Sequence, residues 1–381
     1  MSNPSFRPRL QLFIRYREYT LHGWHLSYFS GKTRGYLNFK NLDFKDKNVN
    51  AYDLMYRIPK KTGATVMPAI QTKQGEWLQD SSIIMEELDK RHPESCVTPS
   101  TPKQLMAAML LEAWLDEWWI PIGMHYRWSY PENYSLFLND ASKGLLPFVP
   151  NVLRKPVATK IAGRLRNYLP IAGVRKEQFE MMERWTNKIL DAFELHFTLY
   201  KFLLGDKPSI ADFALLGPLY GHLNRDPAPK RDLLDVRPNL QNWVERCHAG
   251  EGKQGAYLKD DGIPETLTPI FQAIFDEFYP MVDEIVIKLK GYVADNNKES
   301  GDHITRSVGD ISFPMDGDRF SRAGLPYTVW MMQRIQNCYQ SLTSEDQQQV
   351  DSWSQEYGQY TFLDRDLGPE LKRSAVTTRL A

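Results

Sequence analysis

The chain has 381 residues, with 47 Lys plus Arg and 47 Asp plus Glu, so its formal net charge at neutral pH is zero. This balance argues against a general nucleic-acid-binding role or a polybasic membrane-binding role. No apolar run is long enough to span a bilayer, and residues 1–7 lack the apolar centre of a signal peptide. The length suffices for two or three domains. From the balanced charge and the missing apolar segments we expect a cytoplasmic protein with no nucleic-acid or membrane partner.

The three cysteines have no partner at a suggestive distance in the sequence. Cys96, Cys247 and Cys338 show neither the spacing of a disulfide framework nor that of a metal site. We therefore expect a reducing compartment and no metal cofactor. No two cysteines are separated by two residues, which disfavours a dithiol redox mechanism.

Two strand signals open the chain. Residues Leu10–Tyr16 alternate in part and predict either an added N-terminal strand or an arm. A short β-like run, Tyr19–His22, follows and leads into a helical pattern that continues to about Phe39. We therefore expect a strand-to-helix turn between the run and the helix.

Ser27 lies at this turn, at the start of the segment Ser27–Arg34. The first N–H groups of a helix have no partner inside it, and the helix dipole is positive there, so the position favours an anion. A serine hydroxyl at this point can donate a hydrogen bond to a thiolate, a phosphate or a carboxylate. It can also serve only as the N-cap, because serine is a leading N-cap residue.

A proline interrupts the next apolar run, Val66–Ile70. Since proline cannot donate to a sheet ladder, the run predicts an edge strand or the start of a strand. We predict a cis peptide bond between Met67 and Pro68. The backbone N–H and carbonyl of Met67 would then be free to pair with an extended peptide.

A second strand-to-helix turn is predicted at Asp80 and Ser81. The run Trp77–Gln79 precedes it, and apolar residues with helical spacing follow it, namely Ile83, Ile84, Met85 and Leu88. An acid and a hydroxyl at a helix N-terminus would suit the ammonium and the carboxylate of an α-amino acid. The alternative is a plain pair of capping residues.

Helical signals dominate after the linker His92–Pro102, where prolines end one helix and open the next. Long helices are predicted for Lys103–Ile120 and Glu177–Phe197, and shorter ones for Asp212–Leu223 and Leu240–Cys247. Ser209 and Asp212 have the spacing of a capping box, so we assign them a structural role.

Aromatic residues cluster at the end of the first long helix. Trp114 and Trp118 favour a place in the core, because aromatic side chains bury large areas. Arg127 needs a carboxylate or water partner if it is buried. For four neighbours, namely Trp119, His125, Tyr126 and Trp128, the family resemblance described below implies a place in the wall of a pocket for an apolar ligand.

More than a hundred residues follow Gly255. Helices are predicted for Ile270–Ile285, for Tyr327–Gln340 and from Thr343 to Trp353, with a polar loop between the first two at Asn296–Asp302. Asp316-Gly317-Asp318 could suggest a metal-binding loop. The remaining ligands of a calcium loop are missing, however, so a turn is the favoured interpretation.

The segment from Tyr19 to His92 resembles the N-terminal domain of the glutathione transferases, which has a thioredoxin-like fold. The resemblance implies that Ser27 donates the hydrogen bond that activates glutathione. Proline often follows this serine in the family, whereas Tyr28 stands here. Ser30, Tyr28 and His25 therefore remain alternative partners of the thiolate, and His25 is also a candidate for the substrate pocket.

The resemblance also implies a binding site for the rest of the tripeptide. Met67 and Pro68 match the pair that binds the cysteinyl part of glutathione. Asp80 and Ser81 match the pair that binds its γ-glutamyl end. Lys61, or its neighbour Lys60, is a candidate for the glycine carboxylate, although two adjacent lysines are also consistent with a solvated charge pair.

The capped helix at Ser209–Asp212 extends the resemblance to the all-helical second domain of the family. We therefore predict an α/β thioredoxin-like, glutathione-binding domain in residues 1–93. An all-helical domain follows in residues 101–254. Residues 255–381 are predicted to form a mainly helical extension packed on the second domain.

The chemistry needs no metal and no protein base. A free thiol has a pKa near about 8.5, and lowering that pKa by about two units requires about 2.7 kcal/mol of preference for the anion. One hydrogen bond to an anion contributes about 1.5–3 kcal/mol, and a helix N-terminus contributes up to about 2 kcal/mol. Ser27 and the helix that follows it would therefore suffice.

The resemblance thus implies a glutathione transferase of the detoxifying kind, with glutathione as co-substrate and an apolar electrophile as the second substrate. A homodimer is the expected assembly, although the extension could block the usual interface. The main alternative is a non-catalytic binding or assembly module on the same scaffold. A glutathione-dependent reductase or peroxidase is a third interpretation, which serine at position 27 disfavours.

Overall fold

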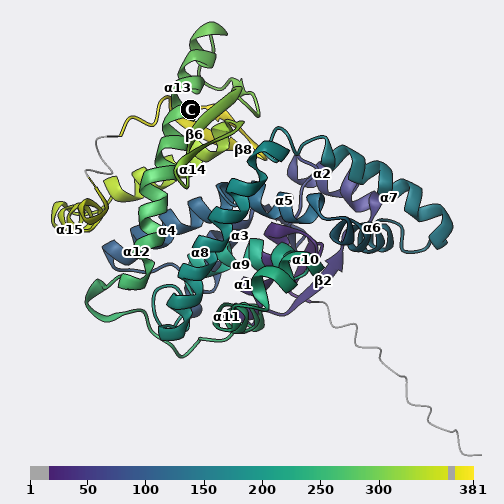
Figure 1. Ribbon diagram of the computed structural model, residues 1–381, viewed down its shortest axis with the longest axis horizontal. Helices are drawn as coiled ribbons and strands as arrows, with labels where there is room; N and C mark the ends of the chain where they lie inside the picture. The colour runs from purple at the N-terminus through teal and green to yellow at the C-terminus, as the bar shows by residue number, and fades with distance from the viewer. Residues whose placement is uncertain (1–16, 359–364) are drawn as a thin grey trace, which may run out of the picture.

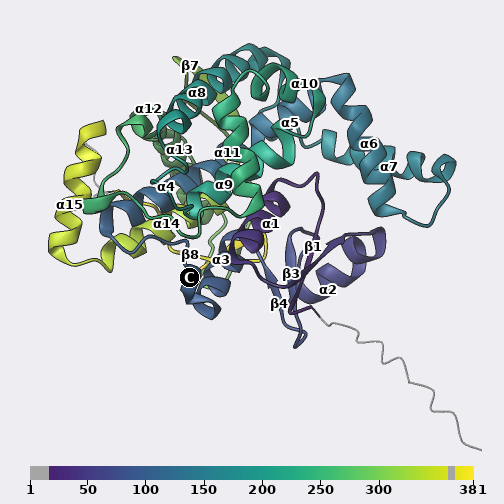
Figure 2. The ribbon, with the colours of Figure 1, turned by 90° about the horizontal axis from the view of Figure 1, so that it is seen from below.

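The computed structural model describes residues 17–358 and 365–381. The predicted first strand, Leu10–Tyr16, lies outside the described residues. An α/β unit, a set of helices and a C-terminal extension pack against one another (Figure 1). The extension lies at one end of the long axis, and helices α6 and α7 project at the other end (Figures 1 and 2).

A four-stranded mixed sheet forms the N-terminal unit, with strand order β2-β1-β3-β4. Strand β1 pairs in parallel with β2 and antiparallel with β3, and β3 pairs antiparallel with β4. The elements are β1 (Tyr19–Gly23), α1 (Tyr28–Lys40), β2 (Phe44–Asn48), a π-helical turn (Asp53–Arg57), α2 (Ile58–Thr62), β3 (Ala69–Thr72), β4 (Trp77–Gln79) and α3 (Ser81–Arg91). The predicted strand at Tyr19–His22 and the strand start after Pro68 are confirmed.

Helix α1 joins the sheet to the helical domain. Ser27 is its N-cap, because its hydroxyl oxygen accepts a hydrogen bond from the N–H of Ser30. The helix ends at Asn41, which adopts the left-handed conformation. Gly35 allows a close approach to the second domain, since a Cβ there would lie 2.3 Å from Leu216 Cδ2. The helix is therefore fixed on both sides.

The second region consists of helices, and its elements are α4 (Pro102–Glu117), α5 (Ile120–Ser129), α6 (Pro131–Leu145), α7 (Asn151–Arg166), α8 (Phe179–Leu199), α9 (Ile210–Pro218), a π-helical turn (Leu219–Leu223), α10 (Pro227–Pro229) and α11 (Pro238–Ala249). The predicted capping box is confirmed: Asp212 accepts hydrogen bonds from the N–H groups of Ser209 and Leu203. Buried Trp114 and Trp118 are core residues, as the sequence predicts.

The extension contains strands as well as helices. Its elements are α12 (Thr268–Ala273), a π-helical turn (Ile274–Phe278), α13 (Tyr279–Asp295), β5 (His303–Ile304), β6 (Asp310–Met315), β7 (Asp318–Ala323), α14 (Pro326–Gln340), α15 (Ser344–Ser354), β8 (Leu371–Ser374) and β9 (Thr377–Leu380). The sequence predicts helices in the regions of α12 to α15. It does not predict the two small sheets, β6-β7 and β5-β9-β8.

Asp316 and Gly317 form the turn of the β6–β7 hairpin. Both have positive φ, which is typical of the tight hairpin turns favoured by an Asp-Gly pair. Asp316 accepts hydrogen bonds from Arg184 and Lys188 of α8. The predicted turn is thus confirmed, and its acid holds the extension to the helical domain.

One continuous core runs through all three regions. Trp118, which directly follows α4, is in ring contact with Trp185 of α8 and with Phe313 of β6 within this core. The extension is therefore part of the folded body. Within the described ranges, no helix combines the length and the apolar composition needed to cross a bilayer.

Candidate functional site

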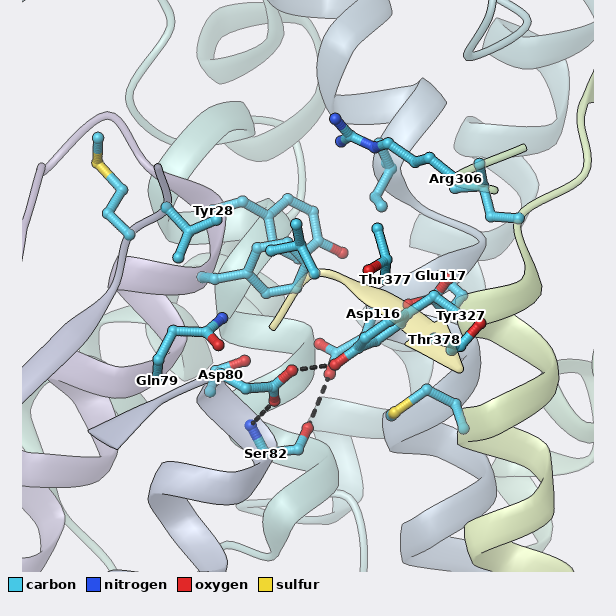
Figure 3. A pocket seen from close by; sticks show the side chains of 18 of the residues that line it. Tyr28, Gln79, Asp80, Ser82, Asp116, Glu117, Arg306, Tyr327, Thr377 and Thr378 are labelled. Atoms are coloured by element: carbon cyan, nitrogen blue, oxygen red, sulfur yellow. Dashed lines mark hydrogen bonds between the residues drawn. The ribbon is translucent and has the colours of Figure 1, made fainter. Parts of the chain in front are cut away.

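A cavity of about 360 Å³ lies where the three regions meet. Its lining comes from the start of α1, the loop before β3, the β4–α3 turn, the end of α4, the start of α14 and strand β9 (Figure 3). The volume falls in the range of small-molecule sites. The extension thus supplies one wall of the cavity.

The loop before β3 contributes a backbone edge to the cavity. The Met67–Pro68 peptide bond is cis, as predicted, and both residues line the cavity. In the described part of the chain, neither the N–H nor the carbonyl of Met67 has a hydrogen-bond partner. Met67 can therefore pair with an extended peptide.

Asp80 caps helix α3 and is already engaged. Its Oδ1 accepts hydrogen bonds from the N–H groups of Ser82, at 3.0 Å, and Ile83, at 3.4 Å. Its Oδ2 accepts a hydrogen bond from the hydroxyl of Tyr327, at the start of α14 (Figure 3). Burial and the nearby Asp80 carboxylate raise the pKa of Tyr327, so this hydroxyl stays protonated. Asp80 therefore has little capacity left for a ligand.

Ser81, by contrast, has both of its donors available. It is the first residue of α3 and lines the cavity. Neither its N–H nor its hydroxyl has a partner among the described residues. A helix N-terminus with a free N–H and a free hydroxyl is suited to a carboxylate.

A buried charge cluster lies directly behind α3. Lys32 of α1, which is fully buried, lies 2.8 Å from Glu112 Oε1 and 2.5 Å from Asp116 Oδ2. The hydroxyl of Ser82 donates to Glu112 at 2.7 Å. Arg334 of α14 lies 3.8 Å from Glu112, so the extension also contributes to the cluster.

Asp116 is the acid of this cluster that lines the cavity, and Ser82 lines it as well. The Oδ1 atom of Asp116 is buried without a hydrogen-bond partner in the described residues (Figure 3). Burial raises the pKa of Asp116 to about 7, with a further contribution from Glu112, although Lys32 opposes the shift. A buried carboxylate oxygen without a partner is costly. The site therefore favours a ligand that supplies a hydrogen-bond donor or a cation.

Glu117 lines the cavity beside Asp116. Its Oε2 accepts a 2.6 Å hydrogen bond from the hydroxyl of Thr328, and its backbone carbonyl accepts one from Arg322. Burial raises the pKa of Glu117. Both acids interrupt the apolar sequence of the first long helix, and this interruption is the signal by which they could have been found.

The start of α1 bounds the cavity through Tyr28 and Phe29, and Ser27 is not among the described lining residues. Ser27 is half-buried, and its hydroxyl proton has no acceptor among the described residues. The hydroxyl of Tyr28 donates to the carbonyl of Leu115. Tyr28 lines the cavity, but its hydroxyl is occupied.

Ser30 and His25, the other two candidate partners of the thiolate, are less suitably placed than Ser27. Ser30 is fully buried, and its hydroxyl accepts from the N–H of Trp24 at 3.4 Å. His25 faces Asp46, with Nε2 3.7 Å from Oδ2, and does not line the described cavity. Ser27 thus keeps a free donor at the helix end, whereas the hydroxyl of Tyr28 is committed.

Four aromatic or imidazole residues expected in the pocket lie elsewhere. None of Trp119, His125, Tyr126 and Trp128 lines the described cavity, and all four are buried. His125 Nε2 lies 2.9 Å from Glu183, and Trp128 packs on Phe137 of α6. A cluster of large aromatic residues in the sequence is consistent with either a core or a pocket wall. In this protein the four residues are packed in the core. Their place in the cavity wall is taken by Ile120 and Met124.

Lys61 is exposed on α2 and does not line the described cavity. Arg306, which the sequence analysis did not single out, lines the side opposite Asp80 and Ser82 (Figure 3). Its guanidinium lies 5.3 Å from the ring centre of Tyr168. The cavity therefore has acids at one side and a cation at the other.

Arg127 has the carboxylate partner that its burial requires. Its Nε lies 2.8 Å from Asp226. It also donates to the carbonyls of Leu26, in the loop before α1, and of Gly221 at 2.6 Å. His222 lines the cavity, and burial together with Arg127 holds its pKa well below the usual value, so it is neutral.

The comparisons with known proteins agree with this architecture. Residues 21–96 match the family description "Glutathione S-transferase, N-terminal domain", and residues 151–251 match "Glutathione S-transferase, C-terminal domain". A search of curated proteins found no match.

Matches among solved structures include a glutathione S-transferase from Rhodospirillum rubrum, at 15% identity and a TM-score of 0.38, which covers 65% of this chain and 96% of that chain. A glutathione S-transferase from Methylobacterium radiotolerans, in complex with glutathione sulfonate, has 18% identity and a TM-score of 0.38, with 65% and 99% covered. A beta-etherase from Sphingobium has 18% identity and a TM-score of 0.41, with 60% and 94% covered.

The first match covers the sheet with α1 to α3, and the second covers α7 to α11. Helices α4 to α6 lie between the two matches, and more than a hundred residues follow the second. The chain therefore contains the N-terminal and C-terminal domains of the glutathione S-transferases, the first thioredoxin-like and the second helical, followed by a long C-terminal extension.

Proposed function

We propose that this protein is a glutathione transferase whose cavity binds the tripeptide between Met67, Ser81 and the extension. The observation that carries the proposal is the set of unused hydrogen-bonding groups that converge on one cavity. These are the backbone of Met67, the two donors of Ser81 and the Oδ1 atom of Asp116. A γ-glutamyl tripeptide has groups that complement all of them.

The tripeptide backbone pairs with Met67, as an added strand pairs with a sheet edge. The α-carboxylate of the γ-glutamyl end accepts hydrogen bonds from the N–H and the hydroxyl of Ser81. The α-ammonium lies on Asp116, because the carboxylate of Asp80 is already held by the N–H groups of α3 and by Tyr327. Asp80 holds the β4–α3 turn in place through its hydrogen bonds to the N–H groups of Ser82 and Ile83.

The thiolate lies at the N-terminus of α1, where Ser27 donates a hydrogen bond to sulfur. Sulfur attacks an electrophilic carbon, and an S–C bond forms. In a halide or an epoxide the bond from that carbon to its leaving group breaks with its electron pair, and in an enone the carbon–carbon π bond breaks and the resulting enolate takes a proton from water. The thiol proton is released to water. Phe29, Ile120, Met124 and Met331 offer an apolar wall for the second substrate.

A binding module on the same scaffold is the second candidate. It is favoured by the absence of Ser27 from the described cavity lining and by the contact of Tyr327 with Asp80. In that case glutathione would bind without turnover.

An assay of conjugation separates the two candidates. The full chain is incubated with glutathione and a panel of apolar halides, epoxides and enones, and binding of glutathione is measured by calorimetry. Conjugation above the uncatalysed rate supports the enzyme. Binding without conjugation of any panel member favours the module, and no binding at millimolar glutathione rejects both.

Ser81→Ala is expected to weaken glutathione binding about tenfold, because a hydrogen bond to a charged carboxylate contributes about 1.5 kcal/mol or more. The readout is the dissociation constant from calorimetry. Ser344→Ala is the matched control, since Ser344 is the first residue of α15 and is not among the described cavity residues. Equal affinity of the two variants would contradict the role of Ser81.

Binding of the tripeptide is expected to strengthen as pH rises from 6 to 8. Only the ionised form of Asp116 pairs with the ammonium, and the pKa of Asp116 is raised to about 7 by burial. S-methylglutathione is the probe, because it has no thiol to titrate. The Asp116→Asn variant should bind more weakly and lose most of this dependence. Glu112→Gln, in the same cluster but outside the described lining, should keep a pH dependence that is shifted to lower pH, because the charge of Glu112 helps to raise the pKa of Asp116. A flat wild-type profile would place the ammonium elsewhere.

A further inference from the structure

The helical pair α6–α7 carries an unusual surface at the connection between its helices. Phe148 is 96% exposed, Val152 is 82% exposed and Leu153 is 63% exposed. These residues lie in the loop and in the first turn of α7, and we call them the α6–α7 tip. All three lie in one short stretch of the chain, where the loop leads into α7.

The same region is strongly basic. Residues 141–176 contain eight Lys or Arg residues and no Asp or Glu, in a chain whose net charge is zero. Lys143, Lys155 and Lys160 are exposed, and none of them forms an ion pair with the described residues. The apolar tip is therefore flanked by cations whose charge is not balanced nearby.

The position of the tip leaves it accessible. Helices α6 and α7 project from one end of the molecule, at the end of the long axis opposite α15 (Figures 1 and 2). Helix α7 is nevertheless anchored, because Ala162 on its inner face is buried with Trp24, Phe137 and Leu145. The exposed face is thus a stable surface of a packed helix.

We propose that the α6–α7 tip binds an anionic lipid surface, with Phe148, Val152 and Leu153 inserted among the lipid chains and Lys155 and Lys160 on the headgroups. An apolar edge with flanking lysines on a helix is typical of interfacial membrane binding. The attraction of each basic residue to an anionic leaflet adds to the burial of the apolar side chains.

Two other occupants fit the surface less well. A symmetric dimer through the tip would bring the same lysines of two copies together, and residues 141–176 offer no acid to pair with them. A nucleic acid would pair with the lysines, but it would leave the aliphatic side chains of Val152 and Leu153 without an apolar partner.

The test is flotation of the full chain with vesicles. Vesicles of phosphatidylcholine with 30% phosphatidylserine are expected to carry the protein, and vesicles of pure phosphatidylcholine to carry at least about tenfold less. Binding should weaken when the salt concentration is raised from 0.1 to 0.5 M, because the screening length falls. Failure to bind the anionic vesicles at 0.1 M salt would overturn the proposal, and this arm requires no variant.

Two variants separate the apolar part from the charged part. The triple variant Phe148→Ser, Val152→Ser, Leu153→Ser and the double variant Lys155→Glu, Lys160→Glu should each lower vesicle binding at least about tenfold. Matched controls on other surfaces are Leu195→Ser with Leu199→Ser, and Lys253→Glu with Lys288→Glu, which should bind as the wild type does. Thermal unfolding checks that the variants fold.

Each remaining outcome decides the proposal. Loss with the lysine variant alone would reject insertion of the tip. Equal loss in the controls would reject the site. Sedimentation as a dimer that the triple variant abolishes, without vesicle binding, would assign the tip to a second copy, and binding of RNA in place of vesicles would assign it to nucleic acid.

Discussion

Replacing Arg127 with Met is expected to lower the free energy of unfolding by about 3–5 kcal/mol, because it would leave the carboxylate of Asp226 buried without a cation. The side chain of Asp226 is fully buried, and Arg127 Nε lies 2.8 Å from it. Arg127 also donates to the carbonyl of Gly221 at 2.6 Å, and that carbonyl would lose a partner. The measurement is chemical denaturation of the wild type and the variant.

The double variant Arg127→Met, Asp226→Asn is the control for this effect. It removes the unpaired charge and keeps the shape of the side chain, so it should regain a large part of the lost stability. Because Arg127 also holds the carbonyl of Leu26, both variants should disturb the loop that precedes α1. A loss below about 1 kcal/mol in the single variant would mean that the pair contributes little beyond packing.

Replacing Ser27 with Ala is expected to shift the pH–rate profile of conjugation to higher pH and to lower the rate at neutral pH by about ten- to a hundredfold. The physical reason is the loss of a hydrogen bond to the thiolate, which contributes about 1.5–3 kcal/mol, with a factor of ten for each 1.4 kcal/mol. Affinity for glutathione should change less, since Met67 and Ser81 hold the tripeptide in the proposed complex.

Thr343→Ala is the matched control for the loss of an N-cap. Thr343 caps α15 and accepts from the N–H of Asp346, as Ser27 accepts from Ser30, and it is not among the described cavity residues. Both variants should lose about 1 kcal/mol of stability, and only Ser27→Ala should change the profile. If Ser27→Ala kept the wild-type rate and profile, Ser27 would be only a cap, and the N–H groups of α1 would be the remaining stabilisers of the anion.

Local patterns were sufficient to predict several elements of the N-terminal unit, although β2 and α2 were not among them. The strand at Tyr19–His22 and the turn at Asp80 depend on neighbouring residues, and turn and cap chemistry is readable at that range. The same holds for the capping box of Ser209 and Asp212. The cis bond at Met67–Pro68 was likewise predicted and is present.

Contacts between distant segments could not be predicted from one sequence. Tyr327 engages Asp80 across 247 residues, and this contact changes which carboxylate is available to a ligand. The choice between core and pocket for Trp119 and Trp128 failed for the same reason. Large aromatic side chains suit both places, and only tertiary packing decides between them.

Two omissions had a signal that was readable. Ile311, Phe313 and Met315 alternate before an Asp-Gly pair, which is typical of a hairpin, and β6–β7 forms there. The neutral charge of the whole chain concealed the basic segment 141–176, because acids elsewhere balance it. Charge counted by segment would have raised the question of a membrane surface.

A crystal structure of the full chain with glutathione tests the central claim most directly. We expect the tripeptide in the cavity, antiparallel to Met67, with its α-carboxylate on Ser81, its ammonium on Asp116 and its sulfur at the N-terminus of α1 beside Ser27. Glutathione bound at another surface, or an empty cavity in a crystal grown at saturating glutathione, would contradict the assignment of this cavity as the glutathione site.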